Sequence, residues 1–215
     1  MSVANEATDE ATAAMVPKGR LRGSYAKTEA TRSAILDSAL EVFALGGYRS
    51  GSLRDIAVRV GMSEAGLLHH FSSKSRLLEA VLERRDAMAD QFVPRQSIDG
   101  PTSVRGLVAL ARYNASTPGV VELYCTLSAE ATSPDHPAHD YFVRRYVVTR
   151  NLLAEAFADL GTKGLLKDGV DPARAASSTI ALMDGLQVQW LLDRTVLDMA
   201  DELRVHLTNI TTLEL

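Results

Sequence analysis

The sequence predicts an all-α protein with a small helical head followed by a larger helical body. In one segment after another, apolar residues recur three, four and seven positions apart, which places them on one face of a helix. Glycine, proline or a helix-capping serine or aspartate separates these segments. With 215 residues, the chain is long enough to bury a substantial core. We assign residues 29–75 to the head and residues 76–215 to the body.

The front of the chain is predicted to be a disordered arm over residues 1–28, because it shows no apolar periodicity and contains Pro17. A helix over residues 29–45 follows and ends at Gly46 and Gly47. The second half of the arm is basic, so it could contact the phosphates or minor groove of a nucleic acid, or only solubilise the chain. Its basic residues are Lys18, Arg20, Arg22 and Lys27.

Residues 52–74 read SLRDIAVRVGMSEAGLLHHFSSK and hold two short helical patterns around a tight turn. The hydroxyl of Ser52 can accept a hydrogen bond from a free amide of the first helix. Gly61 ends that helix, since glycine adopts positive φ without a Cβ clash. Ser63 can cap the second helix, over about residues 64–70. This spacing is typical of a helix-turn-helix.

In a helix-turn-helix, the second helix enters the DNA major groove with its N-terminal residues facing the base edges. We therefore expect Ser63 to Gly66 to read bases. The helix that starts after Ser73 offers free amides to a phosphate, and Lys74 adds a charge. Of the two histidines that end the second helix, one can face DNA while the other packs. The candidate DNA-binding residues are Ser52, Arg54, Ser63, Glu64, Ala65, Gly66, Leu68, His69, His70 and Lys74.

The run RDIAVRVGMSEAGLLHHFSSKSRLLEAVL resembles the tetracycline-repressor-type (TetR) family of bacterial transcription regulators, and the likeness spans about residues 31–82. The resemblance assigns a phosphate-binding role to Lys74 and places the groove-facing small residue at Gly66. Many family members carry a tyrosine that contacts a DNA phosphate, and this chain has Leu68 there. The resemblance also implies a homodimer that a small, often apolar effector releases from DNA.

The charge distribution agrees with DNA contact by one end of the molecule. The formal net charge of the chain is −4. From Lys18 to Lys74, however, nine basic residues face five acidic ones, so that the remainder of the chain is acidic. A basic head on an acidic body favours phosphate contact through the head alone.

In the body, one helix is predicted to continue from Lys74 towards Phe92, with Arg84 and Arg85 on its surface. Further helices are expected over residues 102–117, 120–131, 138–160, 175–192 and 198–213. The last two carry apolar stripes that could pair with their symmetry copies in a four-helix bundle. The stripe of the last helix consists of Met199, Leu203, Leu207 and Ile210.

Aromatic, soft or amide-bearing side chains on the body helices could line an effector cavity, or they could be ordinary core. These candidates are Tyr113, Tyr124, Cys125, Met183, Gln187 and Trp190. Cys125 is the single cysteine, which excludes an internal disulfide and agrees with a reducing compartment. His136 and His139 lie in a proline-rich loop without the three or four ligands that a structural metal site needs.

The sequence contains no catalytic constellation and calls for no cofactor. It also shows neither a membrane span nor a signal peptide, so we expect a cytoplasmic protein. Our leading hypothesis is a homodimeric transcriptional repressor that a small-molecule effector releases from a palindromic double-stranded DNA operator. One alternative is a constitutive DNA-binding regulator or activator without a ligand switch. Another is a helical enzyme whose head resembles the motif by chance.

Overall fold

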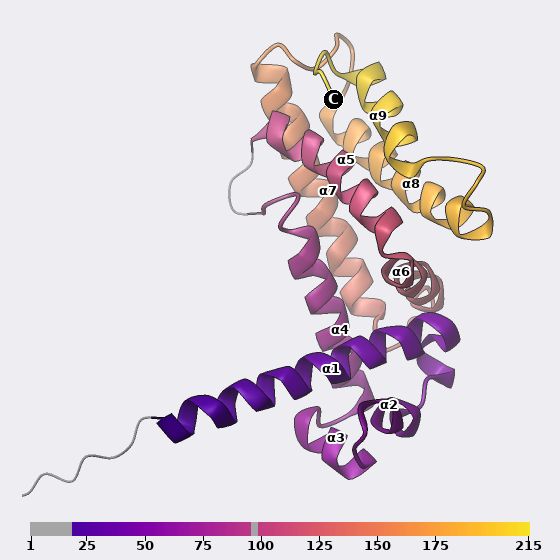
Figure 1. The fold of residues 1–215 in the computed structure, drawn as a ribbon. Coiled ribbons are helices and arrows are strands. Elements are labelled where there is room, and N and C mark those ends of the chain that lie inside the picture. The colour runs from indigo at the N-terminus through magenta and orange to yellow at the C-terminus, as the bar shows by residue number, and fades with distance from the viewer. Residues whose placement is uncertain (1–18, 96–98) are drawn as a thin grey trace, which may run out of the picture.

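The structure is a computed structural model that describes residues 19–95 and 99–215 (Figure 1). Within these residues the secondary structure is α-helical apart from one isolated bridge between Leu166 and Thr211. The predicted all-α fold is therefore confirmed. The helices are α1 (Gly19–Ser50), α2 (Leu53–Val60), α3 (Glu64–His70), α4 (Lys74–Ala89), α5 (Gly100–Ser116), α6 (Pro118–Glu130), α7 (His139–Thr162), α8 (Pro172–Leu192) and α9 (Met199–Ile210).

The first helix is longer than predicted. It begins at Gly19, inside the segment expected to be disordered, and extends as a rod away from the rest of the molecule (Figure 1). Between Pro17 and the predicted start of the helix, the sequence contains no proline that would stop the helix. A helix that is already nucleated gains one hydrogen bond for each residue it adds, which favours its extension towards Gly19. The backbone leaves helical geometry at Gly47, where φ is 69°. The expectations for residues 1–18, including Lys18, lie outside the described residues.

Side-chain caps set the ends of the head helices as the sequence predicts. Ser52 accepts hydrogen bonds from the amides of Arg54 and Asp55 at 3.2 and 3.4 Å. Gly61 ends α2 with φ of 75°. Ser63 accepts a bond from the Gly66 amide at 3.1 Å and so starts α3. These local bonds fix the turn between α2 and α3.

One apolar cluster joins the head to the body. It combines residues of α1 to α4 with residues of α6, on which α1 mainly packs. Head and body are therefore not separated by a solvated linker. Because their shared core is closely packed, a movement of the body also displaces the head. The fully buried members with the largest side chains are Ile35, Phe43, Ile56, Leu67, Leu77, Leu78, Leu82, Leu123 and Leu127.

A second cluster forms the core of the body, where α7 packs along α8 and α5 packs on both α7 and α9. Aspartates cap the starts of α5, α8 and α9, as at Asp171, which accepts a bond from the Arg174 amide at 2.8 Å. The body helices fall within a few residues of their predicted bounds. None of the helices in residues 19–95 and 99–215 has both the length and the apolar content needed to cross a bilayer.

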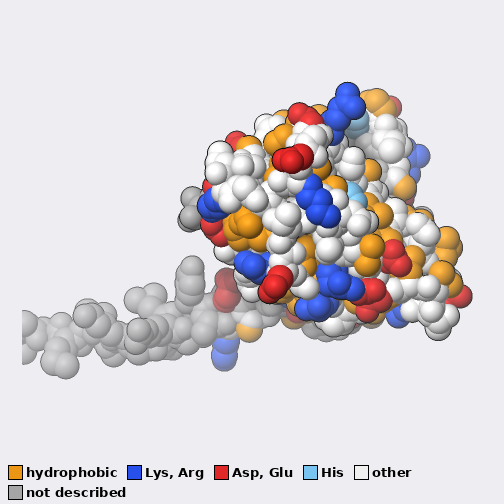
Figure 2. All heavy atoms as spheres, turned by 90° about the horizontal axis from the view of Figure 1, so that it is seen from above, with side chains coloured by type: hydrophobic (Ala, Val, Ile, Leu, Met, Phe, Trp, Pro, Cys, Tyr) orange, Lys and Arg blue, Asp and Glu red, His pale blue; other side chains and the backbone are white. Residues whose placement is uncertain are grey.

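The apolar stripe of the last helix does not face outward as predicted. Met199, Leu203 and Leu207 are buried inside the chain against α5 and α8. A short connection folds α9 back on α8, and this hairpin turns the stripe into the core of its own chain. Seen from the body end, apolar side chains are interspersed with charged ones (Figure 2). The large apolar residues exposed on α8 and α9 are Val188, Leu192 and Val205.

Candidate DNA interface and internal cavity

The second helix of the head, α3, presents its N-terminal turn to solvent. Leu67 is fully buried and anchors the helix to the head core, as does Phe71 just after it. Ser63, Glu64 and Ala65 are exposed, and so are Leu68 and His69 on later turns, whereas Gly66 and His70 are half-buried. The structure thus brings the residues predicted to read bases together on one accessible helix end.

Two of the residues expected at phosphates differ in their surroundings. Arg54 is exposed on the first turn of α2. Lys74 is half-buried, and its Nζ donates to the backbone carbonyl of Arg49 at 3.2 Å and lies 4.5 Å from the ring centroid of Tyr48. Burial lowers the pKa of Lys74, against an opposing effect of Glu130. Lys74 therefore also ties the start of α4 to the end of α1.

The loop histidines have partners within the chain. His136 is buried, its Nδ1 accepts the Ala138 amide at 3.1 Å, and its Nε2 lies 3.3 Å from the Glu130 carboxylate. The Nδ1 of His139 lies 2.8 Å from the carbonyl oxygen of Ala131. These contacts give both rings a structural role at the end of α6.

The body contains a cavity of about 100 Å³ between α4, α5, α7 and α8. Its wall is mostly apolar and includes three of the six predicted effector residues, Tyr124, Met183 and Gln187. The other three lie elsewhere, because periodicity identifies an inward face without telling which cavity or core it meets. Tyr113 lines a neighbouring cavity, Trp190 is part of the body core, and Cys125 packs beside that core.

The neighbouring cavity, of about 150 Å³, reaches the head. Leu36 and Leu40 of α1 line it. It also shares wall residues with the body cavity, so the two spaces lie on either side of the same side chains. These shared residues are Arg85, Ala89, Leu110 and Asn114.

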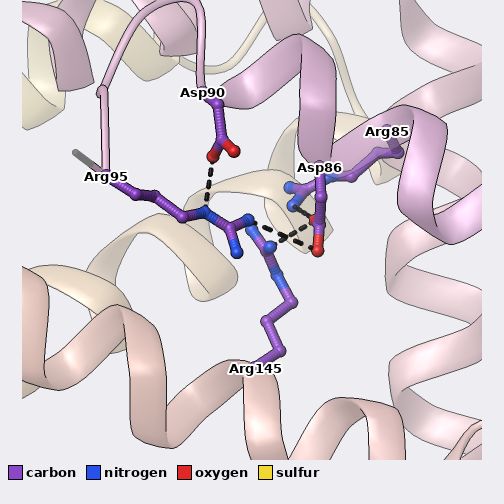
Figure 3. Close-up of polar contacts among 5 residues, drawn as sticks. All are labelled: Arg85, Asp86, Asp90, Arg95 and Arg145. Carbon is purple, nitrogen blue, oxygen red and sulfur yellow. Dashed lines mark hydrogen bonds and ion pairs between the residues drawn. The ribbon is translucent and has the colours of Figure 1, made fainter.

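A group of five charged residues lies at one side of the body cavity (Figure 3), and four of them line it, namely Arg85, Asp90, Arg95 and Arg145. At its centre the Asp86 carboxylate accepts hydrogen bonds from Arg85, at 3.3 Å, and from Arg145 of α7. Arg95 lies 3.5 Å from the same carboxylate and donates to Asp90 at 2.6 Å. We call these residues, Arg85, Asp86, Asp90, Arg95 and Arg145, the arginine cluster.

The arginine cluster is not among the sequence-predicted site residues, and Arg85 does not lie on the surface as predicted. Only 8% of its side chain is exposed, and its guanidinium lies 4.2 Å from the ring centroid of Tyr124. A signal was present, because Arg85 follows Leu78, Val81 and Leu82 at the spacing of the buried face of α4. The packing of Arg145 beside it depends on the tertiary fold.

The α8 side of the cavity carries two polar acceptors. Asp184 accepts a hydrogen bond from the Tyr146 hydroxyl at 2.8 Å. Burial raises the pKa of Asp184, while the Tyr146 bond and the charges of Arg85 and Arg145 oppose that rise. One turn further, the amide oxygen of Gln187 is buried without a hydrogen-bond partner. The cavity therefore offers polar groups to a bound molecule on two sides.

Comparison with known proteins identifies related sequences and structures. The chain matches the family of bacterial regulatory proteins of the tetR type over residues 35–81, and the C-terminal domain of BetI-type transcriptional repressors over residues 105–213. The regulator BetI of Agrobacterium fabrum (strain C58 / ATCC 33970) is 27% identical over 175 residues, which cover 79% of this chain and 81% of BetI.

A second relative, the regulator SrpR of Pseudomonas putida, is 35% identical over 79 residues. That match covers 36% of this chain and 37% of SrpR, so the chain spans little more than a third of this relative's length. Among solved structures, a transcriptional regulator of Saccharomonospora viridis in complex with choline has a TM-score of 0.68 and 26% identity. The superposition covers 85% of this chain and 98% of the neighbour.

These matches agree with the geometry of the molecule. The first falls on the helix-turn-helix of the head, and the second covers just over half of the chain and falls on the body with its cavity. The relatives are helix-turn-helix transcriptional regulators, which are not enzymes. The chain belongs to the TetR family of bacterial transcriptional regulators.

Proposed function

We propose that this regulator is a homodimeric repressor, which a small molecule bound in the body cavity releases from a palindromic operator. The observation that carries the proposal is the position of α4. This helix starts directly after the helix-turn-helix at Lys74 and contributes Arg85 and Ala89 to the cavity wall. A ligand in the body therefore contacts the same rigid element that holds the DNA-binding head.

We infer that Ser63, Glu64, Ala65 and Gly66 face base edges, with Leu68 and His69 near them and His70 at the end of the helix. Exposure of the N-terminal turn of α3 supports this assignment. Gly66 supports it further, because its missing side chain lets the helix approach DNA closely. Ser52, Arg54 and Lys74 would position the head through phosphate contacts, which give affinity without reading sequence.

We infer that the dimer forms through the outward faces of α8 and α9. Val188 and Leu192 are exposed on α8, and space is open around Gly185 on the same helix. A small residue beside exposed apolar ones suits close packing against a second copy of the helix. An isologous pairing would present two heads to successive major grooves, about 34–36 Å apart.

Release by an effector follows from this geometry. Only a body state that holds the two heads at the spacing of the half-sites binds the operator well. A ligand that binds more tightly to a body state with another head spacing lowers the affinity for DNA. The size of this effect is limited by how much more tightly the ligand binds that state than the DNA-binding state. The cavity supports this mechanism over constitutive DNA binding. Because it acts on chromosomal DNA, the repressor would work in the cytoplasm.

Selection of bound sequences from a random DNA pool tests the DNA-binding part. We expect enrichment of a palindrome whose half-sites are one helical turn apart. If the selection enriches no sequence, the DNA-binding part of the proposal is wrong. Fluorescence anisotropy with the enriched operator then tests release by candidate effectors. Choline, which is bound to the S. viridis neighbour, is the first compound to test. Transcription from a reporter behind the operator distinguishes repression from activation.

A further inference from the structure

The arginine cluster carries more hydrogen-bond donors and more positive charge than its own carboxylates can satisfy. Three guanidinium groups face two carboxylates, which leaves a surplus of one positive charge (Figure 3). Each guanidinium has five N–H donors. Arg85 and Arg145 both direct one of these donors at the same oxygen, Oδ1 of Asp86. The hydrogen bonds to Asp86 and Asp90 thus use a minority of the donors, and Arg85 and Arg145 also face the ring of Tyr124, at 4.2 and 5.6 Å from its centroid.

The surplus charge lies where water screens it poorly. Only 8% of the Arg85 side chain and 12% of the Arg145 side chain are exposed, and both residues line the body cavity. A buried charge is costly unless an opposite charge and hydrogen bonds compensate for it. A carboxylate suits guanidinium groups well, because its two oxygens can accept two parallel N–H bonds. The wall of the cavity therefore favours an anion.

The rest of the cavity wall favours an apolar body attached to that anion. Leu107, Leu110, Leu152 and Leu153 line the space beyond the charged groups. We propose that the effector is a small amphipathic carboxylic acid, whose carboxylate binds Arg85 and Arg145 while its hydrocarbon part fills the apolar cavity. The proposal names the ligand class of the effector site and so rests on the proposed function.

Asp184 is the group that could instead attract a cation such as choline. Arg85 and Arg145 form their ion pairs with Asp86, and the Tyr146 hydroxyl donates a hydrogen bond to Asp184. However, Arg85 and Arg145 are close enough to affect the pKa of Asp184 electrostatically. A cation at Asp184 would meet the repulsion of both guanidinium groups. Burial also favours the neutral form of Asp184, which weakens its attraction for a cation.

Isothermal titration of the full chain without DNA tests the ligand class with probes that each have six carbons in an unbranched chain. These probes are hexanoate, hexan-1-ol and hexylammonium, with choline as a further cation. We expect hexanoate to bind at least about ten-fold more tightly than the alcohol, because its charge-assisted hydrogen bonds are stronger than neutral ones. Tighter binding of hexylammonium or choline than of hexanoate would overturn the proposal, and so would equal binding of hexanoate and hexan-1-ol.

Two substitutions with opposite expected effects locate the carboxylate. Arg145→Gln should weaken hexanoate binding about ten-fold or more and leave hexan-1-ol binding unchanged, since it removes one charged donor. Asp184→Asn should leave hexanoate binding intact while Asp184 is neutral, and tighten it at pH values where Asp184 is ionised, because a competing negative charge is then lost. If Asp184→Asn abolishes ligand binding, the site binds cations and the proposal is wrong. Asp184→Asn leaves the arginine cluster in place, so it tests the ligand class even if Arg145→Gln fails to fold.

These titrations use the free protein, so their result does not depend on the operator. If hexanoate fails to bind but another compound releases the protein from DNA, the ligand class is wrong and the proposed function stands. If hexanoate binds but the selection enriches no DNA sequence, the proposed function fails while the carboxylate site stands.

Discussion

The backbone amide of Tyr48 donates a hydrogen bond to the Glu130 carboxylate at 2.8 Å, and this bond joins the end of α1 to the end of α6. The two residues are 82 positions apart in the sequence. Gly47 directly precedes Tyr48, and its φ of 69° turns the chain so that the Tyr48 amide points at Glu130. The contact holds head and body together at one point outside their shared apolar core.

Gly47→Ala should destabilise the protein strongly. A Cβ at this position would lie 2.2 Å from Oε1 of Glu130, and the residue would have to keep a positive φ. With φ of 69° and ψ of −177°, Gly47 lies in a region that is essentially restricted to glycine, and strain there costs about 1–3 kcal/mol for a residue with a side chain. Displacing Glu130 removes a hydrogen bond to a charged group, worth about 1.5–3 kcal/mol. We expect the free energy of unfolding to fall by about 2.5–6 kcal/mol in urea denaturation.

Gly164→Ala is the matched control. Gly164 has nearly the same φ, 67°, but no atom lies within 4 Å of its added Cβ. This variant should lose only the strain contribution of about 1–2 kcal/mol. A loss for Gly47→Ala that is no larger than the loss for Gly164→Ala would mean that the contact with Glu130 contributes nothing to stability.

The sequence predicts features that depend on neighbouring residues. Ser52 and Ser63 cap their helices as expected, because a cap needs only a hydroxyl and amides two or three residues away. Contacts between distant segments, such as that of Tyr48 with Glu130, depend on how the helices pack. Apolar periodicity does not predict which helices pack together. The same reason explains the stripe of α9, which is apolar as predicted but packs inside its own chain.

Phosphate contacts of the head can be tested through the salt dependence of operator binding. Arg54→Ala should weaken binding to all sequences alike, because a phosphate contact carries no sequence information. Each lost contact reduces the slope of log K against log salt by about 0.9, so a dimer should lose about two. The affinity for the selected operator, measured by anisotropy between low and moderate salt, gives the slope. Arg112→Ala, an exposed substitution on α5, should leave it unchanged.

Lys74→Ala should have two effects. Like Arg54→Ala, it should reduce the salt slope of operator binding. It should in addition lower the stability of the free protein, because Lys74 donates to the Arg49 carbonyl and lies over the ring of Tyr48. The stability loss should be about 0.5–1.5 kcal/mol, as for one hydrogen bond. A Lys74→Ala variant that is less stable but keeps the wild-type salt slope would show that the lysine is structural and does not contact a phosphate.

The dimer interface can be located with two glutamate substitutions. Val188 on α8 and Val143 on α7 are similarly exposed, at 48% and 52%, so neither substitution disturbs a core. Val188→Glu should shift the protein towards the monomer in sedimentation velocity, because it would bury an unpaired charge between two copies of α8. Val143→Glu should remain dimeric. The reverse result would assign the interface to α7.

Stability should depend on pH through Asp184. Burial raises the pKa of this carboxyl in the folded protein, while Tyr146, Arg85 and Arg145 oppose the rise. A raised folded pKa means that the folded protein holds the proton more tightly than the unfolded chain. Below the unfolded pKa, Asp184 is protonated in both states and does not destabilise the fold. As pH rises from the unfolded pKa through the folded pKa, Asp184 destabilises the fold increasingly. Asp184→Asn should remove this dependence, so its stability relative to the wild type should improve as pH rises above the unfolded pKa of about 4.

Asp193→Asn provides a control of opposite sign. The hydrogen bonds from Thr195 hold the pKa of Asp193 below its usual value, so this carboxylate stabilises the fold above its unfolded pKa. Asp193→Asn should therefore lose relative stability as pH rises from the lowered folded pKa to the unfolded pKa, and change little above it. Urea denaturation at several pH values measures both differences against the wild type. If both variants changed in the same direction with pH, the environment of Asp184 would not be the apolar one that the cavity implies.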